Sequence, residues 1–379
     1  MRPARYGYTR GWQRGVAALV DGCGRILERK RPIPRAVQSV LLIRLERFGD
    51  LILTLPMLDA LRRRHPRASL TWLVRPVYAD FLRQAVPGIE VVELRSGALR
   101  KRRFDVAYEL HGHPRWIALA RRHAAWVSGH GIRGAGFLLD HDSPLAGTAG
   151  IGSSMPPWLE LTPAWSAAAD AALGPQAEPF IVVHPGCGQP SKRWPEAQWR
   201  EFLAQCAAHE TPVILAGGPA DQAVCAGLAA EGAVAAVLSG LTDWGTLAGL
   251  VARARAVVAP DTGIIHLARA LGTPTVALFG PTDPARWAAA AGPRDRVLLH
   301  KLPCSHCDRG RCLHPAANPF SPCLQAISAI EAWQALAQLF EYSSSQRSPV
   351  STGNSTSRLH SSHEPSYSRA SIPAQRAAK

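Results

Sequence analysis

Long apolar runs are missing from this sequence, although 47% of its 379 residues are hydrophobic. A membrane-spanning helix needs about 20 predominantly apolar residues, and no uninterrupted stretch of that kind occurs. The first residues mix glycines and charges and lack the apolar segment of a secretory signal, so we expect a cytoplasmic protein. Cysteine is scarce, with eight in the chain, which argues against a disulfide scaffold.

Two signatures that would assign other functions are also lacking. No G-x-G-x-x-G followed by an acid opens a helix, as a dinucleotide-binding oxidoreductase would require. A nucleotide-binding oxidoreductase nevertheless stays as an alternative of a different class, because it would share the strand and helix pattern described below. No nucleic-acid recognition motif occurs, so we expect no nucleic-acid partner.

Acidic residues are in deficit, with 28 Asp and Glu against 43 Lys and Arg, and the net charge is +15. Most of the excess lies at the ends of the chain. Residues 1–36 hold nine cations and two acids, giving +7, and residues 343–379 hold five cations and one acid, giving +4. The basicity therefore predicts appendages that meet an anionic surface, on an enzyme body of modest charge.

The two ends differ in pattern. Within residues 11–27 apolar side chains recur at helical spacing with arginines outside the stripe, which is typical of a basic amphipathic helix. We interpret residues 1–36 as an extension that lies on the inner face of the cytoplasmic membrane. The alternatives are a helix packed on the first domain and a poorly ordered leader. Residues 343–379 are Ser-rich without a hydrophobic period, which predicts a disordered tail.

The body alternates short apolar runs with helical stretches, the pattern of an α/β fold. Expected strands are 39–45, 69–74, 89–94 and 104–110, then, after a Pro/Gly/Ser-rich passage at 141–178, 180–186, 212–218, 254–260 and 273–280. Helices are expected over 50–64, where Pro56 kinks or restarts the helix, and over 195–209, 220–230 and 262–271. Two such series predict two Rossmann-like parallel-sheet domains, 37–160 and 161–342, facing a central cleft.

In parallel sheets ligands bind beyond the carboxyl ends of the strands. That rule selects four junctions, namely Glu46–Asp50, His184–Trp194, Gly217–Gln222 and Pro260–His266. In the last of these, the free amides of Thr262 and Gly263 at a helix start would bind an anion. The alternatives are that Asp261 and Thr262 only cap the helix and that His266 is a core histidine.

Two single residues and one cysteine cluster carry further chemistry. Lys192 can neutralise a phosphate or be a solvated lysine, and Asp50 can be a general base or a helix cap. Cysteines spaced C-x₂-C-x₄-C-x₁₀-C could bind zinc, but the second half is not a usual zinc knuckle. For Cys304, Cys307, Cys312 and Cys323 we therefore prefer a structural loop and expect no metal.

Four stretches together resemble glycosyltransferase family 9, which contains the ADP-heptose:lipopolysaccharide heptosyltransferases. They are "LLIRLERFGDLILTLPMLDALRRRHP", "HPGCGQPSKRWP", "VILAGGPAD" and "PDTGIIHLARALGTPTVALFGPTDP", and the likeness covers about 38–335. The resemblance implies the GT-B architecture, with the acceptor on the first domain and the donor on the second. It also implies an inverting transfer without a metal cofactor, from ADP-heptose onto a lipopolysaccharide core or related lipid-linked glycan. Another nucleotide-sugar donor stays as an alternative within the family.

The resemblance also implies roles for single residues. Asp50 would be the base on the acceptor hydroxyl, Lys192 would hold the donor diphosphate, and Asp261 would contact the donor sugar. Thr262 and Gly263 would donate to the phosphates, with His266 close by. The chain departs from the family pattern at Asp221 and Gln222, which match the ribose-binding acid only loosely, and at Cys187 and Gly188, where hydroxyl side chains are common.

Overall fold

The computed structural model describes residues 15, 18–19, 30–131, 135–142, 158–174, 179–230, 234–288, 292–317 and 319–345. Most of the amphipathic helix predicted over 11–27, and the predicted tail from residue 346 onward, lie outside these residues. The last helix, α13 (Ala329–Ser345), includes the first residues of the segment predicted as a tail. No helix in the described part of the chain is long and apolar enough to cross a membrane.

The first sheet has six parallel strands in the order β3-β2-β1-β4-β5-β6. They are β1 (Ser39–Ile43), β2 (Ser69–Val74), β3 (Glu90–Glu93), β4 (Phe104–Glu109), β5 (Ala124–Gly129) and β6 (His141–Asp142). The central strands are buried on both faces, which explains why their sequences are continuously apolar.

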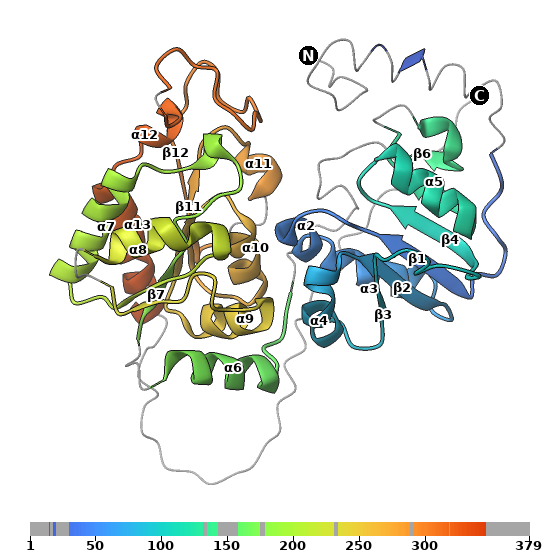
Figure 1. Ribbon diagram of the computed structural model, residues 1–379, viewed down its shortest axis with the longest axis horizontal. Helices are drawn as coiled ribbons and strands as arrows, with labels where there is room; N and C mark the ends of the chain where they lie inside the picture. Colours follow the sequence, from blue (N-terminus) through green and yellow to red (C-terminus); the bar gives the residue numbers. More distant parts are fainter. Residues whose placement is uncertain are drawn as a thin grey trace, which may run out of the picture.

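The second sheet repeats this arrangement in the order β12-β11-β10-β7-β8-β9, again with parallel pairs throughout. Its strands are β7 (Ile181–Val183), β8 (Val213–Leu215), β9 (Ala236–Val237), β10 (Val257–Pro260), β11 (Thr275–Phe279) and β12 (Asp295–Leu299). Both sheets thus have the strand order of a Rossmann fold, with the order reversing between β1 and β4 and between β7 and β10. The predicted pair of Rossmann-like sheets is confirmed (Figure 1).

Helices cover the sheets on both sides (Figure 1). In the first half they are α2 (Phe48–Ile52), α3 (Leu55–Arg64), α4 (Pro76–Ala85) and α5 (Pro114–His123). In the second half they are α6 (Pro163–Leu173), α7 (Glu196–Ala208), α8 (Gln222–Ala229), α9 (Trp244–Arg253), α10 (Gly263–Ala270), α11 (Pro284–Trp287), α12 (Pro322–Gln325) and α13. The helix restart predicted at Pro56 is confirmed, since α2 ends at Ile52 and α3 begins at Leu55, with Pro56 in its first turn.

One expectation about the passage 141–178 is wrong. Its composition indicates a linker, yet Pro163–Leu173 form α6. Thr162 caps this helix, because its hydroxyl oxygen accepts the Trp165 amide at 3.1 Å, and a proline occupies the first turn without losing a hydrogen bond. α6 packs against α9 at the base of the second half (Figure 1).

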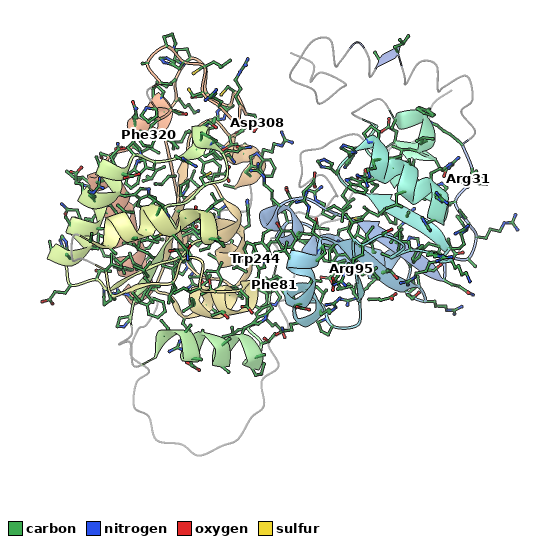
Figure 2. All side chains as sticks on the ribbon, viewed as in Figure 1. Arg31, Phe81, Arg95, Trp244, Asp308 and Phe320 are labelled. Carbon is green, nitrogen blue, oxygen red and sulfur yellow. The ribbon has the colours of Figure 1, made fainter. Side chains whose placement is uncertain are left out.

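The two halves share one hydrophobic cluster that includes residues of both sheets. An aromatic seam joins the halves, made by Phe48 and Phe81 of the first half with Trp165 and the partly buried Trp244 of the second. Phe48 stacks on Trp244 with ring centroids 3.9 Å apart, and Phe81 stacks on Trp165 at 4.7 Å. Figure 2 shows Phe81 and Trp244 at this junction. The seam sets how the two sheets face each other.

The described end of the basic extension packs on the first sheet. The Arg31 amide donates to Asp140 Oδ1 at 2.8 Å, and the Arg31 guanidinium lies 3.2 Å from Asp140 Oδ2. One of the nine cations predicted to meet an anionic surface is therefore neutralised within the protein. The alternative of a helix packed on the first domain concerns residues 11–27, most of which lie outside the described residues, so it stays a prediction.

Candidate functional site

The carboxyl ends of β1, β4, β7 and β10 open into one cleft between the two halves, with a volume of about 970 Å³. These are the strands at which the strand order reverses in each sheet, where open parallel sheets bind their ligands. The cleft is rich in charge. Its cations are Arg44, Arg47, Arg75, Arg115, Lys192 and Arg286, and its acids are Glu46, Asp50, Asp261 and Asp308.

Most of the residues expected from the sequence meet in this cleft. Those that line it are Asp50, Cys187, Gly188, Lys192, Asp261, Thr262, Gly263 and His266. Asp221 and Gln222 are not among its described lining. The Asp221 carboxylate instead accepts the Gly218 amide at 2.8 Å and lies 3.8 Å from His184 Nε2. Asp221 and Gln222 follow β8, which is the neighbour of β7 on the side away from β10. Their role in binding a ribose therefore stays a prediction.

α2 and α10 touch across the cleft floor, one from each half (Figure 1). A Cβ on Gly263 would lie 3.1 Å from the Gly49 amide nitrogen, and a Cβ on Gly49 would lie 2.8 Å from His266 Cδ2. From the sequence we expect Gly263 to bind an anion through its amide. Its missing side chain is first required for the approach of the two helices.

The start of α10 is available for an anion. Thr262 is the N-cap residue, but it makes no side-chain capping bond, and its hydroxyl donates to the Pro260 carbonyl at 3.2 Å. The Asp261 carboxylate is engaged elsewhere, so neither residue acts as the side-chain cap that the alternative required. Uncapped amides and the positive end of the helix dipole therefore lie beside the cleft.

Lys192 and Asp261 form a buried ion pair. Lys192 Nζ lies 2.6 Å from Asp261 Oδ2, and the Thr282 hydroxyl donates to the same oxygen at 2.8 Å. The Asp261 side chain is 4% exposed and that of Lys192 14% exposed. The alternative of a solvated lysine is therefore wrong, because Lys192 is held against the end of β10 by a charge-assisted hydrogen bond.

Asp50 lies on the opposite wall and is held by arginine. Arg44, which is 4% exposed, places Nη2 3.1 Å from Asp50 Oδ1. The Arg47 amide donates to Asp50 Oδ2 at 3.3 Å, so Asp50 also serves as a cap of α2. Burial lowers the pKa of Arg44 from its ordinary value, and the nearby Asp50 carboxylate opposes that change. The Asp50 side chain thus both caps α2 and lines the cleft.

Two buried groups have strongly changed acidities, His266 in the cleft lining and Glu109 at the end of β4. Burial lowers the pKa of His266 to about 4, so its ring is neutral at neutral pH. Burial raises the pKa of Glu109, at the end of β4, to about 7. The Glu109 carboxylate accepts the Gly112 amide at 2.7 Å, which opposes that rise. Perturbed groups of this kind gather at functional clefts.

The sequence analysis missed part of the first-half wall. Lining residues that follow β4 are His111 and His113, from the segment before α5, and Arg115 and Trp116, from the first turn of α5. They follow a predicted strand, 104–110, so the rule that selected the other strand ends would have found them. Arg286 and Trp287 also line the cleft, from α11 after the expected strand 273–280, so the same rule covers them. Asp308 lines it from the segment after β12, a strand that the sequence did not predict.

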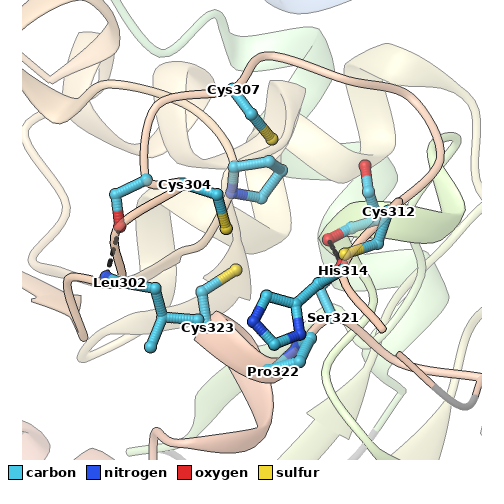
Figure 3. A pocket seen from close by; sticks show the side chains of 11 residues that line it. Leu302, Cys304, Cys307, Cys312, His314, Ser321, Pro322 and Cys323 are labelled. Carbon is cyan, nitrogen blue, oxygen red and sulfur yellow. Dashed lines mark hydrogen bonds between the residues drawn. The ribbon is translucent and has the colours of Figure 1, made fainter. Parts of the chain in front are cut away.

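The cysteine cluster lies at a second, smaller cavity. Cys304, Cys307, Cys312 and Cys323 line it together (Figure 3), and all four are free thiols. Among the described residues no group of three or more His, Cys, Asp or Glu side chains is placed so that it could hold a metal ion. The choice between a structural loop and a metal site therefore stays open at this point.

A family model matches the chain. Residues 148–317 match Glycosyltransferase family 9 (heptosyltransferase), a region that contains the whole second sheet. Over 137 residues the chain is 40% identical to lipopolysaccharide heptosyltransferase 1 of Pseudomonas aeruginosa, covering 36% of this chain and 38% of that protein. Over 112 residues it is 35% identical to lipopolysaccharide heptosyltransferase 2 of Escherichia coli K12, covering 28% of this chain and 32% of that protein. The chain thus matches less than two fifths of the length of these curated relatives.

Solved structures agree over a larger part of the chain. The ADP-heptose LPS heptosyltransferase II of E. coli superposes with a TM-score of 0.67 at 21% identity, covering 81% of this chain and 100% of that one. The E. coli heptosyltransferase WaaC with ADP-2-deoxy-2-fluoro heptose superposes with a TM-score of 0.59 at 21% identity, covering 79% and 99%. These likenesses confirm the expected GT-B fold.

Proposed function

We propose, from the confirmed resemblance of this chain to glycosyltransferase family 9, that it is an inverting glycosyltransferase acting in the cleft between its two sheets. One observation carries the proposal. A carboxylate, Asp50, lies on one wall, and the uncapped start of α10 with Lys192 lies on the other. This is the disposition that a base for an acceptor hydroxyl and a site for a leaving diphosphate require.

The proposed donor is ADP-heptose, bound mainly by the second half, 161–342. The relatives in the comparison are lipopolysaccharide heptosyltransferases, and one solved neighbour was obtained with ADP-2-deoxy-2-fluoro heptose. The sugar acceptor, a lipopolysaccharide core or related lipid-linked glycan, would bind the first half, 37–160. Its wall carries Arg47, Arg75 and Arg115, which suit an anionic acceptor.

The reaction is a single displacement at the anomeric carbon. The acceptor oxygen forms a bond to that carbon as the bond to the diphosphate oxygen breaks, and the acceptor proton passes to Asp50. Negative charge develops on the leaving ADP. The amides of Thr262 and Gly263 and the Lys192 ammonium are preorganised to stabilise that charge where it appears, without help from reorganising water.

Asp261 has two tasks in this proposal. Its Oδ2 holds Lys192 and Thr282, which fixes the ammonium at the end of β10. A carboxylate close to phosphates repels them. In this proposal the other oxygen of Asp261 therefore accepts from the sugar hydroxyls of the donor and does not face its diphosphate. Neutral His266 would add no charge to the site.

Replacing Asp50 tests the proposal. We expect Asp50→Asn to lower kcat by about 10²–10⁴-fold, the usual contribution of a general base, while ADP affinity stays nearly unchanged. Asp59→Asn is the matched control, because Asp59 is an exposed carboxylate of α3 with a side chain 61% exposed. Turnover is measured as ADP release from ADP-heptose with a delipidated acceptor. A normal kcat in Asp50→Asn at saturating acceptor would reduce Asp50 to a helix cap.

Donor competition separates the alternatives. ADP-heptose, ADP-glucose and a UDP-sugar are offered together, and the consumed donor is identified by mass spectrometry. Consumption of a non-heptosyl donor would support the alternative of another nucleotide-sugar donor within the family. Thermal stabilisation by NAD and none by ADP would instead support the oxidoreductase.

A further inference from the structure

A long segment without helix or strand joins the end of β12 to α12. Within 300–317 and 319–321 the described residues form only turns, bends and irregular backbone. Loops of this length inside compact domains are uncommon unless something holds them or they are functional. Three of the four clustered cysteines belong to this segment, and the fourth, Cys323, is the second residue of α12.

The four thiols surround a single small space. Cys304, Cys307, Cys312 and Cys323 line a cavity of about 10 Å³, which is close to the room that one water-sized sphere requires. Figure 3 shows the side chains of these cysteines arranged around that space, with the His314 ring beside it. The volume suits one ion.

The backbone bends sharply at the first pair. His306, between Cys304 and Cys307, and Asp308, directly after Cys307, have φ of 62° and 48°. These left-handed conformations are unfavourable for side chains other than Gly, and they persist only where the surrounding structure fixes them. The turn they make brings both thiols of the C-x₂-C pair to the same cavity.

The cysteine segment is hydrogen-bonded to the short 3-10 turn Pro190–Lys192, which carries Lys192. The Ser191 hydroxyl donates to the Arg309 carbonyl at 2.5 Å, and the Ser321 hydroxyl donates to the Ser191 carbonyl at 2.8 Å. Ser191 directly precedes Lys192 and also lines the cysteine cavity. An interaction that immobilises the cysteine segment therefore also immobilises the backbone at Ser191, next to Lys192.

The local charge suits a tetrathiolate. Four thiolates around a divalent ion carry a net charge of −2. Residues 301–314 contain three cations, Lys301, Arg309 and Arg311, and one acid, Asp308, which gives +2 with neutral histidines. The segment thus supplies the compensating charge from its own side chains.

We propose that Cys304, Cys307, Cys312 and Cys323 form a tetrathiolate site for one soft divalent metal ion, Zn²⁺ or Fe²⁺. The four thiols line the cavity but are not placed as a ligand set, so binding must draw them together around the ion, and it releases four protons to solvent. The ion is a structural staple that holds the segment under Ser191. Its effect on donor binding through Lys192 rests on the proposed function, whereas the site itself does not.

Metal analysis of the full chain tests the site without any substrate. The protein is purified without chelator, from medium containing zinc and iron, and its metal content is measured by elemental analysis. We expect one ion per chain, and the identity of the ion, with its optical spectrum, decides between zinc and iron. Cys304→Ser/Cys307→Ser should lose the ion completely. The control Cys225→Ala, which removes a buried thiol of α8 outside the cavity, should keep it.

Stability measurements separate metal loss from misfolding. Cys304 is exposed and Cys307 half-buried, so the double variant should keep the circular dichroism spectrum of the wild type. A strong chelator should lower the Tm of the wild type and of Cys225→Ala but leave the double variant unchanged. Wild type that contains no metal, or a double variant that retains one ion per chain, overturns the proposal. Failure of sugar transfer would leave the metal count unaffected, so the two proposals fail separately.

Discussion

At the scale of single residues, the proposed function predicts that Lys192 and Asp261 affect the binding of ADP and of the intact donor differently. Lys192→Ala should weaken both ligands about 10–100-fold, since a charge-assisted hydrogen bond contributes about 1.5–3 kcal/mol. Asp261→Asn removes a negative charge beside the phosphates and a partner for the sugar, but its amide oxygen can still accept from Lys192 and Thr282. It should therefore spare ADP and weaken ADP-heptose. Calorimetric titration with both ligands decides the matter, and an equal loss of ADP and donor in folded Asp261→Asn would contradict the sugar contact.

His266 predicts a pH dependence of stability. Its folded pKa of about 4 lies below the ordinary value of 6.5, so the unfolded chain binds more protons between these values. Stability that is present above pH 6.5 is lost as the pH falls toward 4, by up to about 3 kcal/mol. His266→Gln should flatten this loss in urea unfolding measured at several pH values.

Glu109 acts in the opposite direction, because its raised pKa gives stability that is present below pH 4.5 and lost as the pH rises through about 7. For this reason the difference between wild type and His266→Gln is the informative quantity. Equal pH slopes in the two proteins would show that His266 titrates normally.

Site residues could be predicted from the sequence where they follow a predicted strand. Asp50, Lys192 and Asp261 follow apolar runs that could be identified as strands, and all three line the cleft. Their partners were not predictable. Arg44 lies inside an apolar run, and Thr282 lies beyond the next strand, so only the folded arrangement brings them to Asp50 and Asp261.

At the scale of elements, the contact between α2 and α10 depends on two glycines. Gly49→Ala and Gly263→Ala each place a methyl group within about 3 Å of the opposing helix, and overpacking of this kind typically costs about 1–3 kcal/mol. We expect lower stability in urea unfolding and reduced kcat for both. Gly227→Ala in α8 is the control, because nothing lies within 4 Å of its added Cβ.

The control variant should be neutral or more stable by up to about 1 kcal/mol, the helix-propensity gain of Ala over Gly. If Gly263→Ala is as stable and active as Gly227→Ala, the two helices do not need their close approach.

Elements with long apolar runs were predicted well, and weakly patterned ones were not. Seven of the eight expected strands begin within two residues of the start of an observed strand, among them β1, β2 and β11. They could be found because buried parallel strands are continuously apolar. α6 was missed because it is rich in alanine and lies in a Pro/Gly/Ser-rich passage. Its stability comes from packing against α9, which no local pattern reveals.

For the whole molecule, the basic ends predict attachment to an anionic membrane surface. Removing residues 1–29 keeps the Arg31–Asp140 contact and deletes six cations and two acids, a change of −4. We expect weaker co-sedimentation with anionic vesicles at low salt and unchanged turnover of a delipidated acceptor. Removing residues 346–379 is the matched control, since it deletes five cations and one acid, also −4.

Equal vesicle binding by full-length protein and the 1–29 deletion would remove the membrane proposal. Equal losses from both truncations would contradict a specific role for the amphipathic pattern and leave charge alone as the cause.

The aromatic seam has a consequence for how this molecule can be recombined. Phe48 stacks on Trp244 and Phe81 stacks on Trp165, so the stacked contacts of both phenylalanines are made with the other half. A chimaera that takes its donor half from one relative and its acceptor half from another inherits two unmatched surfaces, even when each sheet folds well. Exchange of donor specificity between relatives is therefore expected to succeed by grafting strand-end loops onto an intact pair of halves, and to fail by swapping the halves themselves.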